Sequence, residues 1–338
     1  MFHSRLWQIL AEHGMPHAGA VIRHGSLAVT LFFLLSGFVL SYNYRQRLQP
    51  LQAKRQFWEA RLARIWPVYL FSLLLITIVT WRAAVPHDWR LALATVLMVQ
   101  GWVPGHPEWA GVWNMVIWTL SVEAFFYLLM PFLQTWVDRC SRRTLWLLLA
   151  AVVGIAIAGD VSTKGLVDLG YPGLLEWLPL PVVKLPEFFA GGLIANLLLM
   201  AKGNGWLQQH RYGVLTWGGL ATALLVLGSD SLRMTLVLGP FLLLILGLAV
   251  EKTAFSRLLG SRLLVFGGAI SYSMYLLQVS VKEATRPLLA RVGVHSDTVG
   301  LLAVPVLLVL ISIPTYLLLE EPSRRGMRRL FALRAAHH

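Results

Sequence analysis

Long apolar stretches separated by short polar loops dominate this chain. Nine of them have roughly 16 to 22 residues, close to the ~20 that a helix needs to cross the hydrocarbon layer of a bilayer. They lie at residues 26–44, 62–81, 112–133, 144–159, 182–201, 212–228, 234–250, 263–281 and 299–319. The pattern predicts an all-α, polytopic integral membrane helix bundle with about nine crossings.

A further apolar segment, residues 91–103, has only 13 residues and ends at Val103-Pro104-Gly105. It is too short to cross and predicts a half-helix or re-entrant segment. If it does not cross, 19 of the 29 Lys and Arg residues fall in loops on one side, which the positive-inside rule assigns to the cytoplasm. Residue 1 then lies outside, and the basic tail at 320–338 is cytoplasmic.

Composition supports a membrane protein. The chain is 57% hydrophobic and 13% charged, so 338 residues cannot form a soluble core with an ordinary charged surface. The net charge of +13 follows from basic cytoplasmic loops and does not indicate nucleic acid binding. Cys140 is the single cysteine, which excludes an intramolecular disulfide and a thiolate metal site.

Glu123 is an ionisable residue inside an apolar segment. A charge at the centre of a membrane helix costs about 2.5–3.5 kcal/mol on insertion scales, and such residues more often have a function than not. The alternative is a structural pair with an arginine.

Arg61 and Arg64 are three residues apart and therefore lie on one helical face. Arginine binds phosphate oxygens in a bidentate manner, so the pair is a candidate site for the phosphates of coenzyme A. Simple anchoring of the helix at the cytoplasmic surface is the competing interpretation.

Histidines gather on the predicted outer side, and one of them is a candidate base for removing a proton from a hydroxyl. His13 and His17 are four residues apart, but Pro16 intervenes and no carboxylate completes a zinc pattern, so a metal is not expected.

Several motifs, taken in order, resemble the membrane-bound acyltransferase 3 family. The first two are Phe32 to Phe38 and the basic string from Phe57 to Tyr69. Similar motifs follow along almost the whole chain, at Trp118 to Glu123, Leu185 to Gly192, Phe266 to Gln278 and Glu320 to Arg324. Ser36-Gly37, within the first motif, is interpreted as a helix-packing contact.

The resemblance implies ten helices with both ends in the cytoplasm, so the first helix is expected to be missing. Residues 1–25 would be the remnant of that helix and an outer loop, and 26–319 the transmembrane bundle of a single domain spanning 1–338. His3 matches the local context of the family's proposed catalytic histidine, and His13 is its rival. Thr30 and Gln278 depart from the family pattern, which often has aspartate and histidine there.

The sequence therefore predicts an acyltransferase of the plasma (bacterial inner) membrane. It would move an acyl group, expected to be acetyl, from cytoplasmic acyl-CoA to a hydroxyl of an extracytoplasmic glycan or lipid-linked sugar. The predicted site residues are His3 and Glu123 for catalysis and Arg61 and Arg64 for the donor. A transporter or flippase of a lipid or sugar conjugate, or an inactive relative, is the alternative.

Overall fold

Helices make up all the regular structure in the residues that a computed structural model describes, which are 27–103, 107–168, 177–202, 213–227, 234–291, 293 and 297–327. Within these ranges, six helices are long and apolar enough to cross a membrane, and three shorter apolar helices accompany them. The nine correspond to the nine apolar stretches of the sequence. The all-α polytopic bundle is confirmed as the fold class.

The chain divides into two compact units, one formed by residues 1–49 and 129–260 and the other by 50–128 and 261–338. The first unit contains α3 (Ala28–Tyr44), α7 (Arg142–Asp168), α8 (Leu180–Lys202), α9 (Val214–Leu227), η6 (Met234–Val237), α10 (Leu238–Val250) and α11 (Ala254–Leu259). The second contains α4 (Leu51–Val79), α5 (Trp89–Val96), η2 (Gln100–Trp102), η3 (Pro107–Gly111), α12 (Arg262–Arg291), α13 (Asp297–Thr315) and η7 (Tyr316–Glu320). Helix α6 (Trp118–Val137) begins in the second unit and ends in the first. The single domain inferred from sequence stays a prediction.

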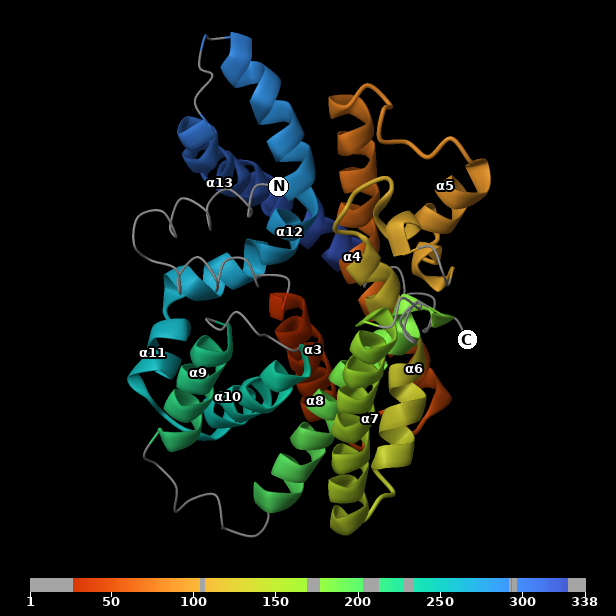
Figure 1. Cartoon of the computed structure of the whole chain (residues 1–338), viewed down its shortest axis with the longest axis vertical. Helices are drawn as coiled ribbons and strands as arrows, with labels where there is room; N and C mark the ends of the chain where they lie inside the picture. Colours follow the sequence, from red (N-terminus) through yellow and green to blue (C-terminus); the bar gives the residue numbers. More distant parts are fainter. Residues whose placement is uncertain are drawn as a thin grey trace. The chain divides into compact units, whose positions relative to one another are not determined.

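In the first unit, α3 packs closely along α8, and the two helices lie side by side in Figure 1. Their backbones approach so closely that a Cβ atom on Gly37 would lie 1.9 Å from the carbonyl oxygen of Phe188. A Cβ on Gly191 would lie equally close, 1.9 Å, to the carbonyl oxygen of Leu34. Small residues permit such contacts in membranes, so the structure supports the packing role expected for Gly37.

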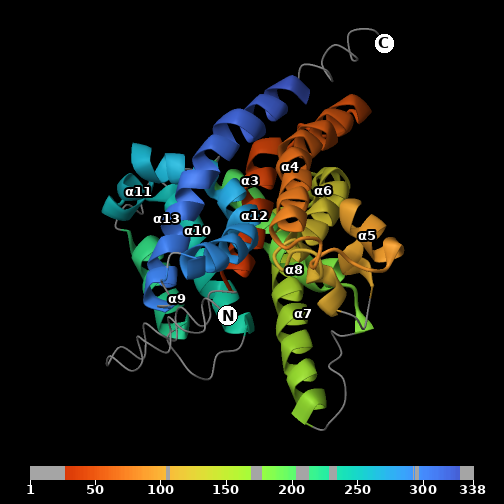
Figure 2. The same cartoon turned by 90° about the horizontal axis from the view of Figure 1, so that it is seen from above.

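In the second unit, α12 is tied to its neighbours by polar side chains, and it packs against α13 (Figure 2). The Tyr272 hydroxyl donates to the carbonyl of Ile65 on α4 at 2.7 Å. The Tyr275 hydroxyl donates to the carbonyl of Val116, just before α6, at 3.0 Å. These bonds to backbone groups set the position of α12 against both helices, because each has a strict donor and acceptor geometry.

Some helix boundaries differ from those expected from sequence. Helix α4 begins at Leu51 rather than at residue 62, because its polar first turns are helical too and carry an Arg55–Glu59 ion pair four residues apart. Helix α6 begins at Trp118 rather than at residue 112. There the side chain of Asn114 accepts a bond from the Val116 amide, a local turn that competes with helix formation.

The short segment at 91–103 is broken, as expected. Helix α5 has eight residues, or about 12 Å of helix, too little to cross the bilayer core. Met98 has a φ of 59°, in the left-handed region, and this turn separates α5 from η2. The Tyr69 hydroxyl donates to the carbonyl of Thr95 at 2.5 Å, and the Gly101 amide donates to Ser121 Oγ at 3.2 Å. The segment is therefore attached to both α4 and α6.

Gly37→Ala should destabilise the protein by about 1–3 kcal/mol, because the new methyl group forces α3 and α8 apart. Gly154→Ala on α7 is the matched control, since its Cβ meets no atom within 4 Å. The control should be neutral or slightly stabilising. Thermal unfolding in detergent measures both, and an unchanged midpoint for Gly37→Ala would contradict the tight contact.

Candidate functional site

Three of the four predicted site residues come together in the second unit. Glu123 on α6 is only 5% exposed, and the charges of Arg64 and Arg61 on α4 both act on its carboxyl group. Arg61 is half-buried and Arg64 is exposed. The fourth, His3, and its rival His13 lie outside the described residues.

Tyr127 connects Glu123 to Arg61. It follows Glu123 by one turn of α6, and its hydroxyl donates a hydrogen bond to the Glu123 carboxylate. Its ring lies beneath the guanidinium of Arg61, whose Cζ atom is 5.7 Å from the ring centroid. One tyrosine therefore contacts both the buried carboxylate and the cation.

Arg61 contacts two aromatic rings that also contact each other. Its Cζ atom is 5.7 Å from the centroid of Phe57 as well, one turn earlier on α4. The rings of Phe57 and Tyr127 meet edge to face at 89° with centroids 6.2 Å apart. Both distances to Arg61 are within the range of cation–π attraction. The Trp58 indole N–H donates to the Tyr127 carbonyl at 3.0 Å and holds α4 against α6 at this level.

A second buried carboxylate, Glu320, is within electrostatic range of one of these arginines, Arg64. It is 5% exposed, and its Oε2 atom accepts a 2.6 Å bond from the hydroxyl of Ser273 on α12. Glu320 ends η7, a π-helical turn, and such wide turns often occur at functional sites. Two described cations act electrostatically on Glu320, namely Arg64 and Arg324, and Arg324 also pairs with Glu321.

Arg64 therefore acts electrostatically on two buried carboxylates, Glu123 and Glu320, contributed by α6 and by the end of the last membrane helix. Tyr272 also lies within range of Glu123, Glu320 and Arg64. Two arginines and two glutamates balance formally in charge, which lowers the cost of placing them in a helix bundle.

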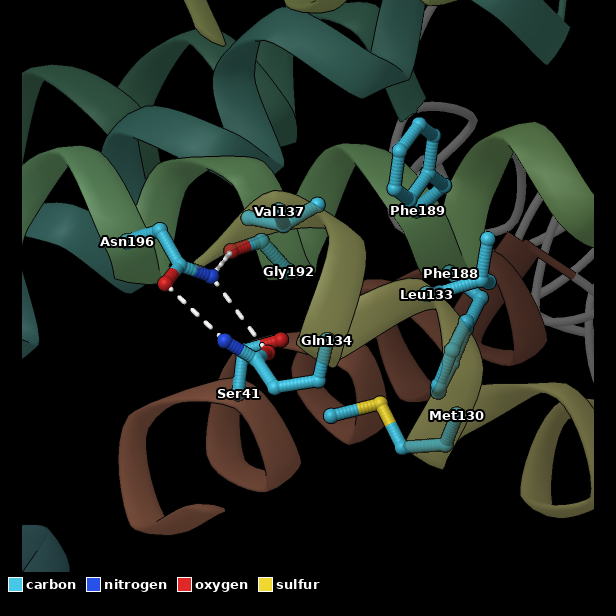
Figure 3. Close-up of a pocket in the computed structure, with 9 residues that line it drawn as sticks. All are labelled: Ser41, Met130, Leu133, Gln134, Val137, Phe188, Phe189, Gly192 and Asn196. Atoms are coloured by element: carbon cyan, nitrogen blue, oxygen red, sulfur yellow. Dashed lines mark hydrogen bonds between the residues drawn. The ribbon is translucent and has the colours of Figure 1, made fainter. Parts of the chain in front are cut away.

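A separate pocket lies in the first unit (Figure 3), and it contains none of these charged residues. Its polar wall is formed by Gln134 and Asn196, whose side chains share a 3.1 Å hydrogen bond, and Asn196 also donates to the Gly192 carbonyl at 2.9 Å. Its free volume of about 10 Å³ is at the lower limit for a single water molecule and far below that of a small-molecule site. We therefore assign it a packing role.

In the described part of the chain, no three His, Cys, Asp or Glu side chains are grouped as metal ligands require. The expectation that the protein binds no metal stays a prediction. Gln278, which stands where many family members have histidine, donates its side-chain N–H to the carbonyl of Tyr275 in the preceding turn at 2.9 Å. It therefore supports its own helix.

Sequence reasoning missed Tyr127 and Glu320 as site residues. Glu320 carried a usable signal, since it closes the apolar run at 299–319 as an ionisable residue, in the same way that Glu123 interrupts its segment. Tyr127 carried a weaker one, its spacing of four residues from Glu123 on a helix. Ser273 and Tyr272 lay in a quoted motif but had no feature that indicated what they contact.

Comparison with known proteins agrees with this arrangement of motifs. Residues 2–320 match the model of the acyltransferase 3 family, described as an acyltransferase domain. The chain belongs to this family of membrane acyltransferases. Acyltransferase MdmB from Streptomyces mycarofaciens is 31% identical over 191 residues, covering 52% of this chain and 47% of that protein. The chain thus matches about half the length of this relative, and no solved structure gives a match.

Arg64→Ala should lower stability, because Glu123 and Glu320 lose a neighbouring positive charge. Arg64→Ala should cost less stability when Glu320 is already Gln. A double-mutant cycle, measured by unfolding the protein in detergent, should give an Arg64–Glu320 coupling energy of about 0.5 kcal/mol or more. Glu251→Gln serves as the control background, since Glu251 caps α9 through Thr216 in the other unit. Equal coupling in both backgrounds would contradict the Arg64–Glu320 interaction.

Proposed function

We propose that this protein is an integral membrane O-acyltransferase. It transfers an acyl group, proposed to be acetyl, from cytoplasmic acyl-CoA to a hydroxyl of an extracytoplasmic glycan or lipid-linked sugar. The observation that carries the proposal is the meeting of Arg61, Arg64 and Glu123 within a helix bundle of the acyltransferase 3 family.

The reaction exchanges a thioester for an ester. The acceptor oxygen attacks the thioester carbon, the carbon–sulfur bond breaks, and the hydroxyl proton passes through a base to the sulfur of coenzyme A. A histidine suits the role of base, since its proton affinity lies near neutrality. His3 is the candidate, with His13 as its rival.

Arg61 and Arg64 are proposed to hold phosphates of the donor. Both act electrostatically on Glu123, and arginine presents a planar fork of donors suited to phosphate. Arg61 lies ten residues beyond Leu51, about 15 Å along α4, so the pair is within the helix rather than at its end. The donor would therefore enter the bundle from the basic side of the membrane.

Glu123 is proposed to hold the arginines, and with them the bound donor, in the geometry of acyl transfer, so that it acts on turnover rather than on donor affinity. Buried and bonded to Tyr127, it supplies negative charge close to both guanidinium groups. A fixed carboxylate needs no reorganisation as the reaction proceeds, which is how preorganised charge assists catalysis. This role does not require Glu123 to contact the acceptor.

The loop charges favour an orientation in which the C-terminal end of the chain lies on the cytoplasmic side of the inner membrane.

A transporter or flippase remains the rival function, because intramembrane charges and interrupted helices also occur in transporters. Thioester consumption separates the two, since only an acyltransferase releases free coenzyme A.

Purified protein should consume acetyl-CoA in the presence of acceptor, and Glu123→Gln should reduce the rate at least about tenfold while the protein remains folded. The amide keeps the size of the side chain but removes the charge near both arginines. Release of free thiol measures the reaction, and detergent unfolding checks the fold. Glu283→Gln on α12, whose side chain is 39% exposed, is the matched control. Full activity in Glu123→Gln would remove Glu123 from the mechanism.

The orientation can be tested with single cysteines in a Cys140→Ser background. Partial burial raises the pKa of the native Cys140 thiol, which makes it react slowly, but it is still best removed. Ala83→Cys, after α4, should react with a membrane-impermeant maleimide in intact cells, while Ala254→Cys, at the start of α11, should react only after lysis. The reverse pattern would overturn the proposed orientation.

A further inference from the structure

Arg61 and Arg64 have different surroundings, although they belong to one motif. Arg64 is exposed and acts on both buried carboxylates, Glu123 and Glu320. Arg61 is half-buried and lies over the rings of Phe57 and Tyr127 at 5.7 Å from each centroid. The two arginines are thus held by different interactions.

Arg61 keeps its hydrogen-bonding capacity in this position. Within the described residues it forms no ion pair, and its buried Nε atom has no hydrogen-bond acceptor. Aromatic faces attract the cation without occupying its N–H donors. The guanidinium is therefore orientated by ring contacts while its donors remain available for an anion such as phosphate.

Tyr127 is the residue that joins this arginine to the buried carboxylate. Its ring contacts Arg61, and its hydroxyl donates to Glu123. Phe57 contacts the same guanidinium, but no hydrogen bond joins it to Glu123. Both aromatic rings contact Arg61, and of these two residues Tyr127 alone also bonds to Glu123.

We propose that Tyr127 is a positioning residue of the acyl transfer reaction. Its ring, together with that of Phe57, presents Arg61 to a phosphate of the donor, and its hydroxyl fixes the carboxylate of Glu123. The inference rests on the proposed acyltransferase function. The two roles of Tyr127 are expected to affect different quantities. The ring affects donor binding, and the hydroxyl affects turnover.

Removing one ring tests the first role. Phe57→Met keeps the volume of the side chain but removes its aromatic face, and it should weaken coenzyme A binding by about 2- to 30-fold, the range of a cation–π contact. The kcat at saturating donor should stay within about twofold of the parent. Titration calorimetry with coenzyme A, on protein in detergent, gives the affinity. Phe125→Met is the matched control, because Phe125 packs edge to face against Trp102 on the same unit.

Removing the hydroxyl tests the second role. Tyr127→Phe keeps the ring under Arg61, so coenzyme A affinity should stay within about twofold, whereas kcat should fall by about 10- to 100-fold, the value of a hydrogen bond to a charged group. Tyr69→Phe is the matched control, since it removes a hydroxyl that bonds to the Thr95 carbonyl. Tyr127→Leu should lose both affinity and turnover.

The outcomes separate this inference from the proposed function. If the parent protein binds no coenzyme A, both are overturned. If binding depends on Arg61, tested by Arg61→Lys, but Phe57→Met binds normally and Tyr127→Phe turns over normally, only the positioning role fails. A fall in unfolding midpoint for both variants, with affinity and kcat reduced together, would show a structural role for Tyr127 and likewise overturn the inference.

Discussion

The need to keep ionised groups inside an apolar helix bundle organises the second unit of this protein. Glu123 and Glu320 are each 5% exposed, and one described cation, Arg64 on α4, acts on both. An uncompensated carboxylate at this depth would cost several kcal/mol. Helices α4 and α6 and the end of the last membrane helix must therefore meet at one level, and the tyrosines of α12 bond to the same region.

The same constraint explains why polar and aromatic side chains contact each of the buried charged groups. Ser273 satisfies Glu320, Tyr127 satisfies Glu123, and aromatic rings cover Arg61. Each partner removes part of the penalty of burial without neutralising the group that it contacts. Charged side chains arranged in this way remain able to interact with an anionic ligand, which a closed ion pair would do less readily.

The first unit depends on close helix packing rather than on buried charge. Its central contact, between α3 and α8, depends on Gly37 and Gly191, because a side chain at either position would overlap a backbone carbonyl of the other helix. Apolar surface offers little driving force between helices in lipid, so close backbone approach and hydrogen bonds such as that between Gln134 and Asn196 take its place.

Sequence alone determined the helical class, the approximate positions of the apolar helices and the short broken segment at 91–103, because segment length and hydropathy are local properties. It also predicted Glu123, Arg61 and Arg64 as site residues, since an intramembrane charge and a helical spacing of three are visible without a fold. The structure brings these three together, and their roles stay predictions. Sequence reasoning placed the start of α6 too early, because the turn at Asn114 depends on one side-chain bond. Only the tertiary structure decided that Tyr127 lies between Arg61 and Glu123, and that Glu320 lies near Arg64. Those contacts join residues from separate helices, whose packing angles and relative depth are set by many contacts together rather than by any local pattern.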